Sequence, residues 1–332
     1  MGAAVAAVFV ILTTEEVGAQ TWRYPVQVNG LAGFIDEAGR MAVEPQFEEL
    51  GAFIEGRSAA RRDGRWGFVD AEGQWRVQPV YRRVEPFSEG VARVLDEVGW
   101  ALIDADGTLL THRSYADLLP MNGGRAAFKT PADAPEKGRW GLLDPTGAEV
   151  VAAVFDGALT YSQGLLPAQR YRKFLVFRIE RRWGYADAGG AWVIEPRYTS
   201  ARPFSDSLAL VTNGRTGRFI RPDGSTAFDV PSQVVFPFRQ GFARFAVDGR
   251  WGFIDGTGAP VVEPRYEAAG DFADGLAAVR ELGRWGYIDA IGREVIRPRF
   301  DRVEPFNGPL ARVALEGRVA YIDREGRTVW GG

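Results

Sequence analysis

Side chains that commonly carry out catalysis are scarce in this 332-residue chain. It contains no cysteine, which excludes thiol catalysis, disulfide bonds and cysteine-ligated zinc. It contains a single histidine, His112, so chemistry that needs an imidazole base has one candidate residue. We interpret His112, in Thr111-His112-Arg113, as a surface histidine at a strand edge. The sequence therefore predicts a protein that is not an enzyme and that uses no cofactor or metal.

Aspartates recur along the chain at a regular spacing that could suggest a row of metal-binding or glycan-cleaving carboxylates. Each of them, however, opens an Asp-x-x-Gly sequence, as in Asp70-Ala71-Glu72-Gly73. Asp at the first position and Gly at the fourth are typical of a type I turn, in which the carboxylate bonds to the backbone. We therefore predict that these aspartates are turn residues and not ligands or catalytic acids.

Arginine-tryptophan pairs precede many of these turns, and such pairs can stack on sugars or peptides. The tryptophans are Trp66, Trp140, Trp183, Trp251 and Trp285. Identical tryptophans at corresponding positions are expected where each unit of a repeated structure packs against the next. We interpret them as core residues whose arginine neighbours cover the edge.

One basic and aromatic cluster is the candidate binding site. Its residues are Arg170, Tyr171, Arg172 and Lys173. They lie in the interval between Gly141 and Gly184, which is 43 residues long where the regular copies of the repeat are 34 or 35 residues apart. Insertions in repeat arrays usually map to one loop face and often carry binding. The cluster predicts a lengthened hairpin that contacts a partner, and a solvated hairpin tip without a partner is the alternative.

The elements that position these residues are copies of one phrase, Arg-Trp-Gly-aromatic-Ile-Asp-x-x-Gly. It occurs nine times, starting at Leu31, Arg65, Gly99, Arg139, Arg182, Arg215, Arg250, Arg284 and Arg318. Its aromatic and branched residues favour an extended strand before the turn. A second strand ends in Pro-x-aromatic, as in Val261 to Tyr266, and a third precedes the next phrase, as in Leu276 to Arg280. Each unit thus predicts about three short strands, and the chain is expected to be all-β.

The phrase, the turn and the Pro-x-aromatic ending together resemble the WG-repeat (KWG repeat) family of bacterial proteins. The resemblance extends from Gln20 to Trp330, and the copies depart from the phrase at Ala32, Ala101, Thr216 and Ala320. Degenerate copies are expected at the ends of an array and in diverged units. The resemblance implies β-hairpin repeats and an interaction role, and it carries over no catalytic residue.

Repeated units of this kind can stack in an open array or close into a ring. A unit of about three strands is smaller than the usual four-stranded propeller blade. The last copy also ends at Val329-Trp330, when its second strand has barely begun. We therefore expect tandem β-hairpins in an open, twisted solenoid, with a propeller-like ring as the alternative.

The first nineteen residues predict a signal peptide, residues 1–19, ahead of an array over residues 20–332. An apolar run from Ala3 to Leu12 is followed by Val17-Gly18-Ala19, the small-residue spacing of a cleavage site. The run is too short for a permanent membrane span. We expect a bacterial periplasmic or secreted protein, with a cytoplasmic location as the alternative.

The charges narrow the class of partner. The chain has 40 basic and 43 acidic residues and a net charge of -3, with the signs interspersed, so it lacks the basic excess of a nucleic-acid binder. Our first hypothesis is an exported, non-catalytic scaffold that binds a protein or a cell-envelope polymer. A surface enzyme active on glycans and a purely structural spacer are the alternatives.

Overall fold

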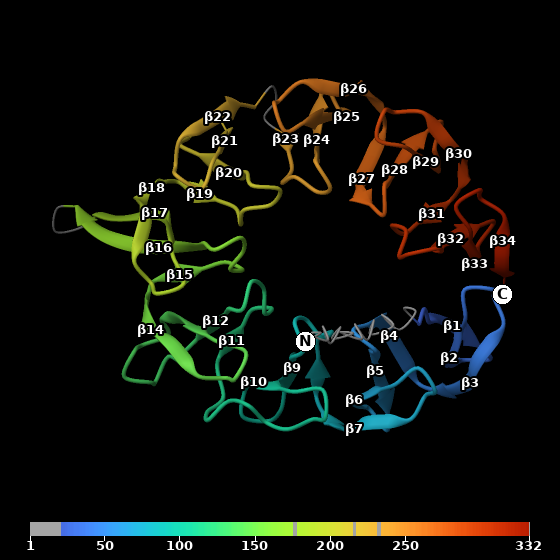
Figure 1. Cartoon of the computed structure of the whole chain (residues 1–332), viewed down its shortest axis with the longest axis horizontal. Helices are drawn as coiled ribbons and strands as arrows, with labels where there is room; N and C mark the ends of the chain where they lie inside the picture. The colour runs from blue at the N-terminus through green and yellow to red at the C-terminus, as the bar shows by residue number, and fades with distance from the viewer. Residues whose placement is uncertain (1–20, 175–177, 215–216, 231–233, 332) are drawn as a thin grey trace, which may run out of the picture.

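The structure is a computed structural model that describes residues 21–174, 178–214, 217–230 and 234–331, and their side chains except those of 172–174 and 178–180. The described residues form nine antiparallel sheets and no helix. The sheets follow one another around a closed ring, as the blades of a propeller do (Figure 1). We number them blade 1 to blade 9 in chain order.

The strands are assigned to the blades as follows. Blades 1 to 3 contain β1 (Tyr24–Val28), β2 (Leu31–Ile35) and β3 (Met41–Phe47); β4 (Glu49–Ile54), β5 (Arg57–Arg62), β6 (Arg65–Val69) and β7 (Trp75–Tyr81); and β8 (Arg83–Val84), β9 (Ala92–Leu95) and β10 (Trp100–Ile103). Blades 4 to 6 contain β11 (Asp117–Leu118), β12 (Ala126–Lys129), β13 (Trp140–Leu143) and β14 (Glu149–Phe155); β15 (Gly157–Ala158), β16 (Leu166–Phe174), β17 (Arg178–Ala186) and β18 (Trp192–Tyr198); and β19 (Ser200–Ala201), β20 (Ala209–Thr212), β21 (Gly217–Ile220) and β22 (Thr226–Asp229). Blades 7 to 9 contain β23 (Val234–Val235), β24 (Phe242–Val247), β25 (Arg250–Asp255) and β26 (Pro260–Tyr266); β27 (Ala268–Ala273), β28 (Leu276–Glu281), β29 (Arg284–Ile288) and β30 (Glu294–Phe300); and β31 (Arg302–Val303), β32 (Ala311–Leu315), β33 (Arg318–Ile322) and β34 (Thr328–Gly331).

The two ends of the array meet, so the open solenoid predicted from the sequence is wrong and the propeller-like alternative is right. The ring centroids of Tyr24 in blade 1 and Tyr321 in blade 9 are 5.4 Å apart. The Tyr24 hydroxyl donates to the carbonyl of Asn307 at 2.9 Å, and the Tyr321 hydroxyl donates to the carbonyl of Pro25 at 2.8 Å. Side-chain packing and hydrogen bonds therefore close the ring.

The error came from a strand hidden in what the sequence presents as a loop. Most blades begin with a strand of two residues, such as β31, placed just before the Pro-Phe segment. Two residues are too few to show an alternating pattern. This strand occupies the inner edge of its blade (Figure 1), and it raises the unit from three strands to the four that are usual in a propeller.

The glycine of the repeated phrase accommodates a bulge in the outermost strand. Between β6 and β7 the register shifts from Trp66 opposite Tyr81 to Phe68 opposite Val77. A Cβ atom added to Gly67 would lie 2.3 Å from the carbonyl oxygen of Val77. Because no side chain fits there, glycine lets the bulged backbone cross close above the neighbouring strand.

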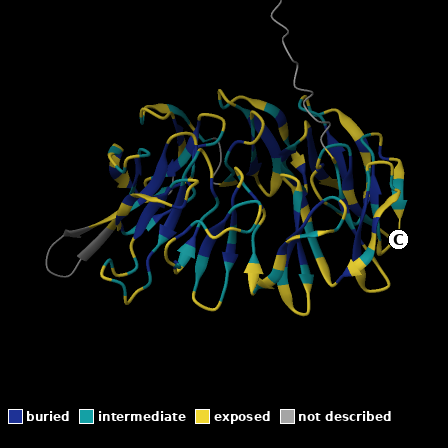
Figure 2. Ribbon diagram, turned by 60° about the horizontal axis from the view of Figure 1, so that its bottom comes forward, coloured by how far each residue is buried: buried dark blue, intermediate teal, exposed yellow. Residues whose placement is uncertain are grey.

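The hydrophobic core is divided among the interfaces between neighbouring blades. An aromatic ring from the third strand of one blade packs on a ring from the first turn of the next, as for Phe68 and Phe87, whose centroids are 4.7 Å apart. The phrase tryptophans pack against these clusters, as Trp140 does with 9% of its surface exposed. The middle strands of the blades are largely buried, whereas many loops and alternate residues of the outer strands, such as those of β3 and β30, are exposed (Figure 2). Trp140 is thus a core residue as predicted, whereas Trp66, Trp183, Trp251 and Trp285 are half-buried at the edges of their clusters.

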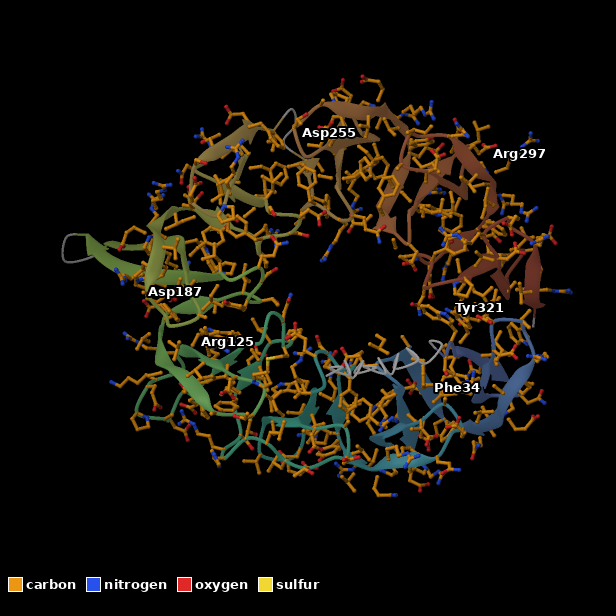
Figure 3. All side chains as sticks on the ribbon, viewed as in Figure 1. Phe34, Arg125, Asp187, Asp255, Arg297 and Tyr321 are labelled. Carbon is orange, nitrogen blue, oxygen red and sulfur yellow. The ribbon has the colours of Figure 1, made fainter. Side chains whose placement is uncertain are left out.

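The Asp-x-x-Gly turns form as predicted. In each described copy the amide of the glycine donates to the carbonyl of the first turn residue, as from Gly73 to Asp70 at 3.1 Å. The Asp70 carboxylate accepts from the amides of Glu72 and Gln74. Figure 3 shows where two other turn aspartates, Asp187 and Asp255, lie in the ring.

Candidate functional site

The lengthened hairpin predicted from the sequence is formed by β16 and β17. Each strand has nine residues, longer than any other strand described. The hairpin extends beyond the outer rim of the ring (Figures 1 and 2). Its register places Tyr171 opposite Arg181 and Arg170 opposite Arg182. The insertion thus lengthens β16 and β17, and the lengthened part of the hairpin projects from the ring.

Arg170 and Tyr171 are held at the base of this hairpin. The Arg170 guanidinium lies 4.8 Å from the centroid of the Trp192 ring and 3.6 Å from the Glu195 carboxylate. Tyr171 is 40% exposed, and the Arg181 guanidinium lies 5.1 Å from its ring centroid. These contacts make a surface of stacked cationic and aromatic groups.

Arg172 and Lys173 belong to the same strand, and their side chains lie outside the described residues. Their backbone register is defined, with Arg172 opposite Glu180 and Lys173 opposite Ile179.

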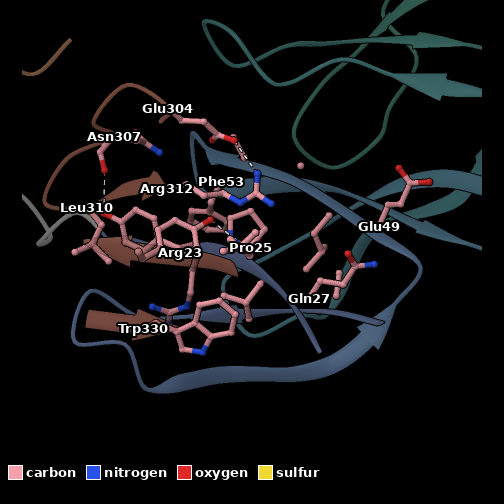
Figure 4. A pocket seen from close by; sticks show the side chains of 18 of the residues that line it. Arg23, Pro25, Gln27, Glu49, Phe53, Glu304, Asn307, Leu310, Arg312 and Trp330 are labelled. Atoms are coloured by element: carbon pink, nitrogen blue, oxygen red, sulfur yellow. Dashed lines mark hydrogen bonds and ion pairs between the residues drawn. The ribbon is translucent and has the colours of Figure 1, made fainter. Parts of the chain in front are cut away.

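A second site lies where the ring closes. Blade 1 has three strands, and among the described residues none pairs with the inner edge of β1. A hollow of about 800 Å³ occupies this place, between β1, the inner strand β4 of blade 2, and blade 9 (Figure 4). Tyr24, Phe53 and Trp330 contribute aromatic surface to its wall. The volume suits a small molecule or a few residues of a peptide.

Several of the charged side chains around the hollow form ion pairs. The Arg312 guanidinium lies 2.8 Å from the Glu304 carboxylate, and Arg61 pairs with Glu49. Burial raises the pKa values of Tyr24 and Tyr321 above the usual value for tyrosine, and both hydroxyls act as hydrogen-bond donors. This wall can pack against a ligand and hydrogen-bond to it.

In each blade that has an inner strand, the turn between the first and second strands points toward the centre of the ring (Figure 1). Polar contacts join many of these turns to the turn of the next blade. The Glu55 carboxylate accepts from the amides of Glu89 and Gly90 in the next blade at 2.8 and 2.9 Å. The Glu89 carboxylate accepts in turn from Gly123 and Gly124 at 2.7 and 2.8 Å. Gln163, Asp206, Gln240 and Asp274 make the corresponding contact in later blades. We call these side chains the inner-rim acceptors.

The single histidine of the chain lies on the surface. His112 is exposed and stands in a bend. Within the described part of the chain, no group of three or more His, Asp or Glu residues is placed to hold a metal ion. The described residues also include no helix with the length and hydropathy needed to traverse a bilayer.

The repeat that builds both sites matches a known family. The family described as WG containing repeat matches residues 33–66, 66–96, 140–173, 183–215, 251–285 and 285–318, which is more than half of the chain. The protein belongs to the WG-repeat family. The resemblance inferred from the repeated phrase is thereby confirmed. The matched unit is one blade long and is offset from the blades, since residues 251–285 run from the third strand of blade 7 to the third strand of blade 8.

One solved structure shares the fold of this WG-repeat protein without close sequence similarity. A crystal structure of the eukaryotic initiation factor is 9% identical, with a TM-score of 0.64 over 94% of this chain and 96% of that one. Kluyveromyces lactis Hsv2p is 8% identical, with a TM-score of 0.42 over 70% of this chain and 89% of that one. No curated protein matches the sequence significantly. The likeness to the first structure supports the propeller fold alone.

Sequence reasoning found the hairpin and missed the hollow at the ring closure. Blades 2 to 9 each carry a characteristic pair of residues before the second strand. The pair is an apolar residue followed, three positions later, by Phe, Tyr or Met, as in Val303 and Phe306. The residues before Tyr24 lack this pair. In the sequence, this absence distinguishes the first unit from the others. It became meaningful once the inner strand was recognised as part of the repeat.

Proposed function

We propose that this WG-repeat protein is a non-catalytic binding scaffold that contacts an anionic protein surface or cell-envelope polymer through the β16–β17 hairpin. The hairpin is the observation that carries the proposal. It projects from an otherwise regular ring (Figure 1), and lengthened loops on a rigid repeat scaffold are common binding elements.

Charge supports the choice of partner. Between Gln169 and Arg182 the sequence contains six arginines and lysines and one acidic residue, Glu180. The register places Arg170 opposite Arg182 and Tyr171 opposite Arg181, so cationic residues gather on both strands of the hairpin. An anionic partner would gain hydrogen bonds from these guanidinium groups.

A capture experiment tests the proposal. Immobilised protein is incubated with envelope extract and with purified polymer fractions, beside a variant carrying Arg170→Glu, Arg172→Glu and Lys173→Glu. A second variant with Arg40→Glu, Arg293→Glu and Arg297→Glu makes the same change of charge on exposed arginines of other blades. Figure 3 shows Arg297 at the outer rim, away from the hairpin.

The native protein and the second variant are expected to retain one partner that the hairpin variant loses. Retention by all three proteins would place binding elsewhere on the ring and contradict the hairpin assignment. No specific capture by any of them would favour a structural spacer. Turnover of a glycan fraction would contradict the non-catalytic proposal.

The proposal includes export to the periplasm or the medium. It rests on the sequence of residues 1–19, which lie outside the described residues. Expression in a bacterial host, cell fractionation and N-terminal sequencing of the product provide the test. A periplasmic or secreted product that begins at Gln20 is expected, and a cytoplasmic product that retains residues 1–19 would contradict export.

A further inference from the structure

Gln27 in β1 stands at a register position that is paired in every other blade described. In those blades the corresponding residue lies opposite the first residue of the inner strand. These residues are Arg61, Leu95, Lys129, Gln169, Thr212, Ala246, Arg280 and Ala314. In blade 1 the described residues provide no inner strand, and Gln27 is exposed and lines the hollow.

The backbone of Gln27 has hydrogen-bonding capacity directed at this hollow. Val28 and Leu31 flank a two-residue turn in β1–β2, so the groups of Val28 and Val26 bond to β2 and those of Gln27 face the other way. In blade 9 the carbonyl at the same position, that of Ala314, accepts from the amide of Asp301 at 2.8 Å. Gln27 therefore offers an amide and a carbonyl to an extended chain.

The hydroxyl of Tyr321 is directed at the same place. Tyr185 and Tyr287, at the same position of their blades, donate to the carbonyls of Arg202 and Glu304, which follow the inner strand of the next blade. The described part of blade 1 offers Tyr321 no such carbonyl after an inner strand, and Tyr321 donates to Pro25 in β1. A segment in the hollow could accept this hydrogen bond from Tyr321.

Pro25 does not prevent pairing at this edge, although a proline has no amide to donate. Blade 5 carries Pro167 at the same register position of its second strand. That strand still pairs with an inner strand, with Ala158 opposite Ala168. The carbonyl of Pro167 also accepts from the amide of Leu159 at 3.0 Å.

The sequence before β1 does not have the character of an inner strand. In the other blades the inner strand begins nine residues before the residue equivalent to Ala311, which pairs with Ile322; in blade 9 this strand begins at Arg302. Counting nine residues back from Tyr24 gives Glu15, so that Glu16 stands where Val303 stands in blade 9. A carboxylate at a position that is apolar elsewhere argues that the segment comes from another chain.

We propose that the hollow at the ring closure binds a short extended segment of a partner protein, which pairs with β1 at Gln27 as an added inner strand. Its second residue is a small or branched apolar one, because the inner strands of the other blades carry Leu, Val or Ala there. The segment needs no aromatic residue three positions after this apolar one, since the Tyr24 ring already packs on Tyr321. The added strand gains affinity from backbone bonds and specificity from one side-chain pocket.

Binding of a labelled peptide with the sequence of residues 300–306 to the full chain tests the proposal, with fluorescence anisotropy as the readout. A peptide of the same sequence with Val303→Asp is the control ligand. Gln27→Pro removes the backbone amide, and Gln27→Ala changes the side chain while it keeps the backbone. Thermal unfolding of both variants shows whether they are folded.

The native chain and Gln27→Ala are expected to bind the first peptide, with at least about tenfold weaker binding by Gln27→Pro and by the Val303→Asp peptide. Equal binding by folded Gln27→Pro, or of both peptides, would overturn the proposal. So would no binding at about 1 mM peptide, the weak end of specific affinities. Dimerisation of the native chain that Gln27→Pro abolishes would make the occupant a second copy and would overturn its assignment to a separate partner. None of these outcomes depends on the β16–β17 hairpin.

Discussion

Two residues of the repeated phrase are required for different structural reasons. The phrase glycine is required because of what is near it, since the carbonyl of Val262 leaves no room for a side chain at Gly252. The turn aspartate is required because of what it binds, since the Asp255 carboxylate accepts from Thr257 and Ala259. Both reasons lie inside one blade, which explains why the same letters recur in most copies.

Gly252→Ala is expected to lower the free energy of unfolding by about 1–3 kcal/mol, the usual cost of forcing atoms into a packed site. Its added Cβ would lie 2.3 Å from the Val262 carbonyl oxygen. Gly256→Ala in the same blade is the matched control, because a Cβ there meets nothing within 4 Å. Urea unfolding of the three proteins measures the difference. Equal losses in both variants would contradict this explanation of the glycine.

The turn aspartates make stability depend on acid pH. Hydrogen bonds from the Thr108 amide to Asp104, and from the Thr146 and Thr257 hydroxyls to Asp144 and Asp255, hold the pKa of each carboxyl below its usual 3.8. The folded state therefore binds fewer protons than the unfolded state near this pH. The stabilisation is complete above the unfolded value and is lost as the pH falls through the lower, folded value.

Urea unfolding at pH 6 and pH 3 checks this effect. A lower free energy of unfolding at pH 3 is expected in the native chain. A variant with Asp104→Asn, Asp144→Asn and Asp255→Asn should be less sensitive to the same change of pH. An identical loss in the two proteins would show that other carboxylates are responsible.

At the scale of elements, the blades are joined by the inner-rim acceptors as well as by apolar packing. Each acceptor stands in the turn after the inner strand and reaches the backbone of the next turn. Gln163 and Gln240 serve in places where Glu or Asp serves elsewhere, so a single neutral acceptor is sufficient. The contact is broken between blades 4 and 5, where Gly123 occupies the acceptor position and a Cβ there would touch the Tyr161 ring at 3.3 Å.

Glu89→Ala is expected to lower the free energy of unfolding by about 1 kcal/mol, because the amides of Gly123 and Gly124 lose their acceptor. Glu89→Gln should cost less, as the natural glutamines suggest. Glu72→Ala, at an exposed residue of blade 2, controls for the loss of charge. A loss from Glu72→Ala as large as that from Glu89→Ala would indicate a general charge effect.

The sequence predicts elements well where a local pattern determines them. The Asp-x-x-Gly turns and the Trp-Gly strands were identified because turn chemistry and alternation act over a few residues. The inner strands could not be found this way, since β15 or β19 has two residues and owes its conformation to its neighbour. The β16–β17 hairpin was found through its length. Its position outside the ring follows from the way the blades are arranged.

At the scale of the whole molecule, closure depends on residues that are far apart in the sequence. Tyr24 stands where the other second strands have a smaller residue such as Ala311, and its ring fills the place of the aromatic side chain that an inner turn would supply. Its hydroxyl bonds to Asn307, 283 positions away. No periodic pattern reports such a contact, so the choice between an open array and a ring could not be made from the repeat alone. The hollow at the closure was missed for the same reason.

The distance between the two ends of the array tests closure most directly. The chain has no cysteine, so cysteines placed at Met41 and Thr328 can carry spin labels without other changes. These residues begin the outer strands β3 and β34 at equivalent positions of blades 1 and 9. Glu294 and Thr328 are the equivalent pair in blades 8 and 9 and give the reference distance.

Pulsed electron paramagnetic resonance measures the distance between the two spin labels in each doubly labelled protein and is the decisive measurement. A closed ring predicts the same short distance for both pairs, with narrow distributions. In an open array of nine sheets, spaced by about 10 Å each, the labels at Met41 and Thr328 would be about 80 Å apart. That longer distance, with the reference pair unchanged, would contradict the closed propeller.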